Sequence, residues 1–152
     1  MENTLELLNQ FDDVSTIVKE HPRDRLLSPS ISDKMENVTI VKDEISSASL
    51  IDWGDIFLSL GTTITFEPIM RQKPVLAIEY AHANHSVVSD YFFNTDLRTK
   101  EDLYHTIHEF LTDGTQDFYD EHEHDEFVDE MISPTEETVL DSWAGFIELQ
   151  CQ

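Results

Sequence analysis

Two short apolar runs, joined by a turn and a helical segment, dominate the centre of the sequence at residues 53–80, WGDIFLSLGTTITFEPIMRQKPVLAIEY. Residues 56–60 and 75–78 are nearly continuous in apolar side chains, which is typical of strands buried on both faces. Gly61 permits a tight turn after the first run, and the Thr-Thr pair behind it is suited to cap a helix. A strand–helix–strand unit of this length requires a parallel sheet, because only a crossover connection returns the chain in the same direction.

Strands and helices alternate along most of the chain. Further strands are predicted at 14–19, at 38–41 and within 92–97, where β-branched and apolar residues gather. Helical spacing or capping residues predict helices at 3–11, from Ser46-Ser47 through Trp53, after Gly61, from Thr99 onward and after Pro134. This alternation predicts an α/β fold: a Rossmann-like doubly wound parallel sheet of about five strands with C-terminal helices packed against it.

The composition changes near residue 113. With 152 residues the chain has the length of one domain with an appendage. Acidic residues dominate 116–131, with aromatic and apolar side chains between them as core contacts. We therefore expect a nucleotide-binding domain at 1–112 and an acidic helical extension at 113–152 that packs on it.

The charge balance excludes several classes of partner. The chain has 32 acidic and 9 basic residues, for a net charge of −23. Such a surface repels nucleic acids and anionic membranes, so neither is expected as a partner. Neither a signal peptide nor an integral membrane segment is predicted, and Cys151 is the single cysteine, so a cytoplasmic protein without disulfides is expected.

The predicted strands end in polar loops that are suited to a phosphorylated ligand. In parallel sheets ligands bind at the carboxyl ends of the strands, where Gly61, Thr62 and Thr63 follow one strand. The N-terminus of the next helix, with two hydroxyls, is suited to a phosphate. The other reading of Gly-Thr-Thr is a simple turn and cap. Glu67, one turn later, is placed either to bind a ribose diol or to complement the helix dipole.

A second loop carries several of the scarce cations and imidazoles. Lys19, His21, Arg23 and Arg25 cluster around the end of the strand at 14–19, and they would hold a diphosphate together with the threonine hydroxyls.

Histidines also follow the strand at 75–78 and recur near residue 122. Three polar residues lie just past that strand: His82, Asn84 and His85. They are either contacts to the base or sugar of a nucleotide-sugar donor or ordinary polar residues of a surface loop. No metal site is expected in His122-Glu-His-Asp125, because alternate positions of a helix point in different directions.

The motifs KEHPR (19–23) and DWGDIFLSLGTTITFEPIMRQKPVLAIEY (52–80) resemble, in their order and spacing, the C-terminal half of GT-B glycosyltransferases. The resemblance covers roughly residues 5–112. It is to enzymes of surface and capsular polysaccharide assembly: capsule and Kdo-type transferases, CDP-glycerol glycerophosphotransferases and bacterial sialyltransferases. By this resemblance His21, Thr62 and Thr63 contact the phosphate of the donor nucleotide, and Glu67 binds its ribose.

The resemblance implies a function and a missing partner. The chain would be the nucleotide-sugar-binding half of a transferase, with the donor as substrate, no separate cofactor and no metal. An N-terminal acceptor-binding domain or subunit would complete it, and without that half, or the first strand of the donor domain, we expect no transfer. Pro68 departs from the family pattern and predicts a helix that begins late or bends. The alternatives are a UDP-sugar 2-epimerase-like domain and a non-catalytic Rossmann-like module that binds a nucleotide or a protein.

Overall fold

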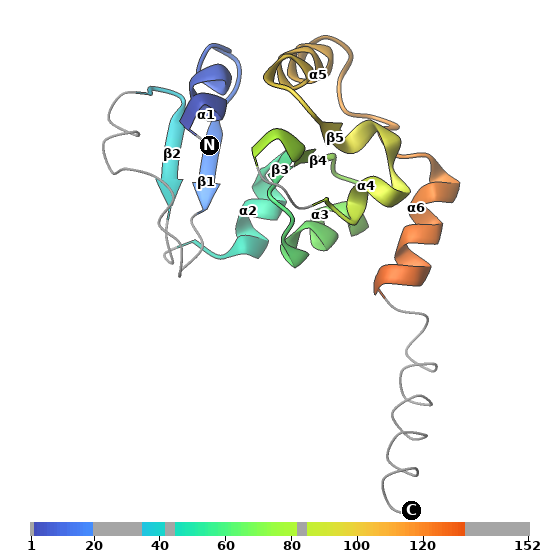
Figure 1. The fold of residues 1–152 in the computed structure, drawn as a ribbon. Coiled ribbons are helices and arrows are strands. Elements are labelled where there is room, and N and C mark those ends of the chain that lie inside the picture. Colours follow the sequence, from blue (N-terminus) through green and yellow to red (C-terminus); the bar gives the residue numbers. More distant parts are fainter. Residues whose placement is uncertain (1, 20–34, 42–44, 82–84, 133–152) are drawn as a thin grey trace, which may run out of the picture.

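The computed structural model describes residues 2–19, 35–41, 45–81 and 85–132. These residues form a mixed α/β fold in which helices surround short parallel strands (Figure 1). The helix predicted after Pro134 lies outside the described residues.

The described strands form two separate parallel sheets. β1 (Thr16–Lys19) pairs with β2 (Val38–Val41) in one sheet. β3 (Phe57–Ser59), β4 (Val75–Ile78) and β5 (Asp96–Leu97) form the other, with β4 in the centre. The parallel arrangement agrees with the prediction, but the single sheet of about five strands is wrong. The crossover from β2 to β3 passes β1, and among the described residues no ladder joins β1 to β3.

Helices occupy the segments between and after the strands. The α-helices are α1 (Glu2–Leu8), α2 (Ser47–Trp53), α3 (Phe66–Met70), α4 (Val88–Tyr91), α5 (Lys100–Asp113) and α6 (Glu121–Phe127). Single turns of other helix types are η2 (Thr63–Thr65), η3 (Glu79–Ala81), η4 (Phe93–Thr95) and η5 (Val128–Ile132).

β4 separates two apolar cores, and all four of its residues are buried, as its apolar run predicts. Leu76 belongs to the core formed with α1 and α5, whereas Val75 belongs to the core formed with α3, α4 and α6. Successive strand residues face opposite sides of the sheet, so the continuous apolar run follows directly from helices on both faces. Burying one such side chain contributes about 1.5–3 kcal/mol.

Local capping signals set the start of α5. The Thr99 hydroxyl accepts the Asp102 N–H, and the Asp102 carboxylate accepts the Thr99 N–H at 2.7 Å, which forms a capping box at the predicted start of the helix. Leu103 and Ile107, four residues apart, are buried on one face of the helix. Leu111, in the last turn, is 48% exposed.

The acidic segment after α5 contacts the second core through a few large side chains. Phe127 of α6 is fully buried and packs edge-on against Phe66 and Tyr91. His124 is also buried, and its Nε2 lies 2.9 Å from the carbonyl oxygen of Ile69. The domain boundary between residues 112 and 113 remains a prediction.

Candidate functional site

The chain leaves β3 through a turn that only glycine adopts easily. Gly61 has a φ of +77°, in the left-handed region. Its N–H donates to the Ser59 Oγ at 3.1 Å, so this backbone donor is already used inside the turn. The prediction of a tight turn at Gly61 is confirmed. Its N–H, however, is bonded to Ser59 and does not point to a ligand.

The helix that follows is shorter than the sequence suggests and lacks a side-chain cap. Thr62 is the N-cap residue of η2, but its hydroxyl makes no capping hydrogen bond, and the α-helix proper begins only at Phe66. The predicted side-chain cap is therefore wrong, and the late start expected from Pro68 is confirmed. Because α3 has five residues, its dipole adds little at this edge. Thr62 and Thr63 are both exposed and present their side chains to solvent.

Glu67 is held by a cation. Its carboxylate lies 2.6 Å from the guanidinium of Arg71, one turn later in α3. The same guanidinium also pairs with Asp52 at the end of α2. All three side chains are at least 37% exposed, so these pairs contribute little stability. They nevertheless occupy the carboxylate that was predicted to bind a ribose, and a sugar would have to displace Arg71.

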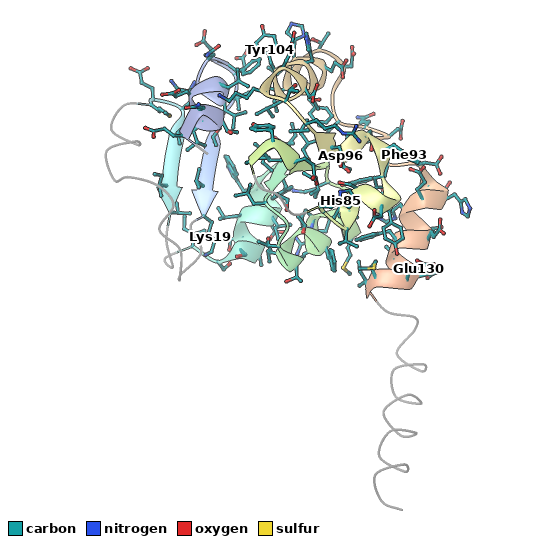
Figure 2. The ribbon with its side chains drawn as sticks, viewed as in Figure 1. Lys19, His85, Phe93, Asp96, Tyr104 and Glu130 are labelled. Atoms are coloured by element: carbon teal, nitrogen blue, oxygen red, sulfur yellow. The ribbon has the colours of Figure 1, made fainter. Side chains whose placement is uncertain are left out.

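His85 lies just past β4 among carboxylates (Figure 2). Its Nε2 is 2.8 Å from Asp90, and its Nδ1 is 3.9 Å from Glu79. The hydrogen bond to Asp90 raises the pKa of His85, and the nearby charges of Asp90, Glu79 and Asp96 act in the same direction. The position after β4 is the predicted one, but Asp90 already engages the Nε2 of the ring.

A hollow of about 370 Å³ lies beside the end of β4, at a place that the sequence analysis missed. It is formed where α1, η3 and the start of α5 meet. Burial raises the pKa of Tyr80, whose hydroxyl is 3.1 Å from that of Thr4. The lining residues are Glu2, Asn3, Thr4, Tyr80, Ala81 and Lys100.

A sequence signal for this hollow existed. Tyr80 follows β4 by two residues and Lys100 follows β5 by three, and adjacent parallel strands end at the same edge of a sheet. Of the residues predicted to bind the donor, none of those that the structure describes lines the hollow.

The predicted cationic loop is only partly described. Lys19 ends β1, and its ammonium donates to the carbonyl oxygen of Ile45 before α2. His21, Arg23 and Arg25, and also His82 and Asn84, lie outside the described residues. Lys19 is the last residue of β1, whereas His85 lies in the segment that follows the other sheet, between η3 and α4 (Figure 2). Among the described residues no ladder joins β1 to the sheet of β4.

Neither a metal-binding cluster nor a membrane-spanning helix is found within the described residues. No group of three or more His, Cys, Asp or Glu side chains within them is arranged to hold a metal ion. His124 is buried against Ile69 while His122 is exposed, so their imidazoles diverge. Each helix in these residues is too short or too polar to cross a lipid bilayer.

Comparisons with known proteins complete the description of the site. No protein-family model matches the chain. Searches of curated proteins and of solved structures likewise found no match.

Proposed function

We propose that the chain is the nucleotide-sugar-binding half of a GT-B-like glycosyltransferase of surface or capsular polysaccharide biosynthesis. In this proposal the donor lies at the carboxyl edge of β3, β4 and β5, and a Rossmann-like arrangement of strands supports it. Transfer requires an acceptor-binding domain or subunit.

One observation carries the proposal. Three adjacent parallel strands end at one edge, and that edge holds both the exposed threonines after β3 and the hollow beside β4. Ligands of open parallel α/β sheets bind outside the carboxyl ends of the strands.

The chemistry of the edge is suited to a phosphorylated sugar. Lys100 supplies an ammonium group for a phosphate, and the Thr62 and Thr63 hydroxyls add neutral donors. On a chain with a net charge of −23, a local cation is required to hold an anion. Glu2 and Asn3, also at the hollow, are suited to the hydroxyl groups of a sugar.

A thermal-shift panel tests the proposal. The full chain is titrated with UDP, CMP, CDP, GDP and their sugar conjugates. A ligand at one hundred times its dissociation constant stabilises the folded state by about 2.7 kcal/mol, which is readily measured as a rise in the unfolding midpoint. We expect one nucleotide family to raise the midpoint, and the sugar conjugate to raise it further.

Two variants place the ligand. Lys100→Met and Thr62→Val should each reduce the shift, because they remove an ammonium and a hydroxyl from the proposed edge. Thr112→Val is the matched control, since that hydroxyl donates to the carbonyl of His108 within α5. Equal shifts for all four proteins would mean that the nucleotide binds elsewhere. The absence of any shift, with or without an added acceptor-domain partner, would contradict the proposal.

A further inference from the structure

β1 and β3 each have one edge that forms no ladder with another strand among the described residues. The Thr16 N–H donates to the Asn37 carbonyl on the β2 side. Amide groups of successive strand residues point to opposite edges, so the N–H and C=O of Ile17 point away from β2. In the same way Phe57 donates to Pro74 on the β4 side, and the backbone of Leu58 points away from β4. Such groups form a template for another strand.

The two unpaired edges border the same core. Val18 of β1 and Leu58 of β3 pack against the cluster that contains Leu76 of β4. Figure 1 shows β1 on the side of its pair that is nearer the three-stranded sheet, and β3 on the side of that sheet nearer β1. The residues of β1 are only half-buried, in contrast to the fully buried β4. These apolar side chains are therefore incompletely covered at the place where the sheets separate.

Two helices indicate that the strands of both sheets run in the same sense. Thr4, in the first turn of α1, is hydrogen-bonded to Tyr80, which follows the C-terminal end of β4. Asn9, which follows the C-terminal end of α1, is hydrogen-bonded to Asn37, which precedes β2. The segment before α2 is bonded to Lys19 at the end of β1. At the C-terminal end of α2, three carbonyl groups accept hydrogen bonds from Lys73, which lies just before β4. Both helices therefore run opposite to the strands of the two sheets.

We infer that β1 and β3 bind one β-strand of a partner polypeptide, inserted between them and parallel to both. The observed orders are β2-β1 and β3-β4-β5, so each sheet begins at the unpaired edge and continues away from it. One inserted strand would unite them in the order 3-2-1-4-5-6 of the dinucleotide-binding fold, with the insert in position 1. The same insertion would cover the half-buried residues of β1.

The structure also defines the chemistry of the partner strand. A central strand of a parallel sheet is buried on both faces, so the insert is a short run of Val, Ile or Leu. Because the chain carries a net charge of −23, basic residues on either side of the run favour its association. This inference does not depend on the proposed function, because the strand needs no nucleotide to bind.

Hydrogen exchange measured by NMR tests the inference on the full chain. The probe is a soluble synthetic peptide with a Val/Ile centre and lysines at both ends. In the free chain the amides of Ile17 and Leu58 should exchange faster than those of Thr16 and Phe57, which are bonded within their sheets. Excess peptide should slow the exchange of Ile17 and Leu58 by about tenfold or more. No slowing of these two amides would overturn the inference.

Matched variants separate ladder formation from other binding. Ile17→Pro and Ile17→Ala both remove the side chain, but only proline removes the N–H at the open edge. Peptide binding should be lost in the first and kept in the second. A peptide with proline at its centre makes the same test without changing the protein, and it should not bind. Binding of this peptide as tight as that of the original would contradict strand insertion.

The remaining outcomes identify other occupants. Slow exchange of Ile17 and Leu58 in the free chain at every concentration would mean that the chain itself covers these edges. Protection that rises with protein concentration, without peptide, would identify a second copy as the occupant. Either result would overturn the assignment to a partner strand.

Discussion

The Tyr119 hydroxyl accepts the backbone N–H of Val75 at 2.8 Å and donates to the Lys73 carbonyl at 3.1 Å. Val75 is the first residue of β4, and β5 reaches only as far as Ala77 along its neighbour. The Val75 amide points toward β5, because the preceding carbonyl points toward β3. The Tyr119 hydroxyl thus supplies the hydrogen bonds that the short β5 does not. Burial raises the pKa of Tyr119.

Tyr119→Phe should destabilise the fold. The substitution leaves the Val75 N–H and the Lys73 carbonyl without this partner in a partly buried place, which costs about 1–3 kcal/mol. The free energy of unfolding from urea titration measures the effect. Tyr91→Phe is the control, since it removes an exposed hydrogen bond to Glu130 and should change stability by less than about 0.5 kcal/mol. Equal losses in the two variants would contradict the role of Tyr119.

Lys73→Met should weaken the end of α2. The ammonium donates to the carbonyl groups of Ile51, Asp52 and Gly54 at 2.7, 3.0 and 2.8 Å. Hydrogen bonds that involve a charged group contribute about 1.5–3 kcal/mol, and carbonyls at a helix C-terminus favour a cation. Urea unfolding should show a loss in this range. Arg98→Met, which affects a loose pair with Asp96 at 3.5 Å, should be nearly neutral.

Phe92 and Phe93 make a matched pair of neighbours. Phe92 is fully buried and packs against Phe127, whereas Phe93 is 89% exposed (Figure 2). Phe92→Ala should cost about 3–5 kcal/mol, because it removes apolar contacts and leaves a cavity. Phe93→Ala should change the free energy of unfolding by less than about 0.5 kcal/mol. A large loss on truncating Phe93 would mean that its ring is covered in solution.

The capping box predicts a pH dependence of stability. Hydrogen bonds to the carboxylate, first that from the Thr99 backbone, lower the pKa of Asp102 from its ordinary value of 3.8. A carboxyl group with a lowered pKa stabilises the fold above the unfolded-state pKa, and this contribution disappears as the pH falls through the folded-state value.

Asp102→Asn should therefore be less stable than the wild type at neutral pH, and the difference should vanish in acid. Urea unfolding at several pH values measures it. The control is Asp113→Asn at the end of the same helix, where loss of a negative charge should be neutral or stabilising at neutral pH. A difference for Asp102→Asn that persists below the folded-state pKa would contradict the assignment.

Asp90 should control the pH at which His85 titrates. The hydrogen bond to Asp90 raises the pKa of His85 from its ordinary value of 6.5. Stabilisation by a histidine with a raised pKa is fully present below the unfolded-state pKa and is lost as the pH rises through the folded-state value. NMR titration should show that Asp90→Asn lowers the midpoint of His85. Asp125→Asn, on α6, should leave it unchanged.

The sequence alone determined the elements whose signals are local. β2 and β4 have the predicted bounds 38–41 and 75–78, and α5 begins directly after Thr99, as predicted. The turn at Gly61 also follows from the residue type. These features depend on the side chains of one short segment, on β-branching, helix capping and backbone freedom, so they can be read directly from the order of residues.

Only the tertiary structure decided how these elements combine. The division into two sheets depends on which edges meet, and the edges of β1 and β3 carry no distinguishing local pattern. The candidate site also depends on tertiary contacts. Arg71 pairs with Glu67, Asp90 is hydrogen-bonded to His85, and the hollow joins residues 2–4 to residues 80, 81 and 100. Tyr119 was predicted as a core contact of the acidic extension and His124 only as part of it, but neither of their hydrogen bonds to backbone groups far away in sequence was predicted. A hydrogen bond to a distant backbone group leaves no trace in local composition, so the three-dimensional arrangement is needed to find it.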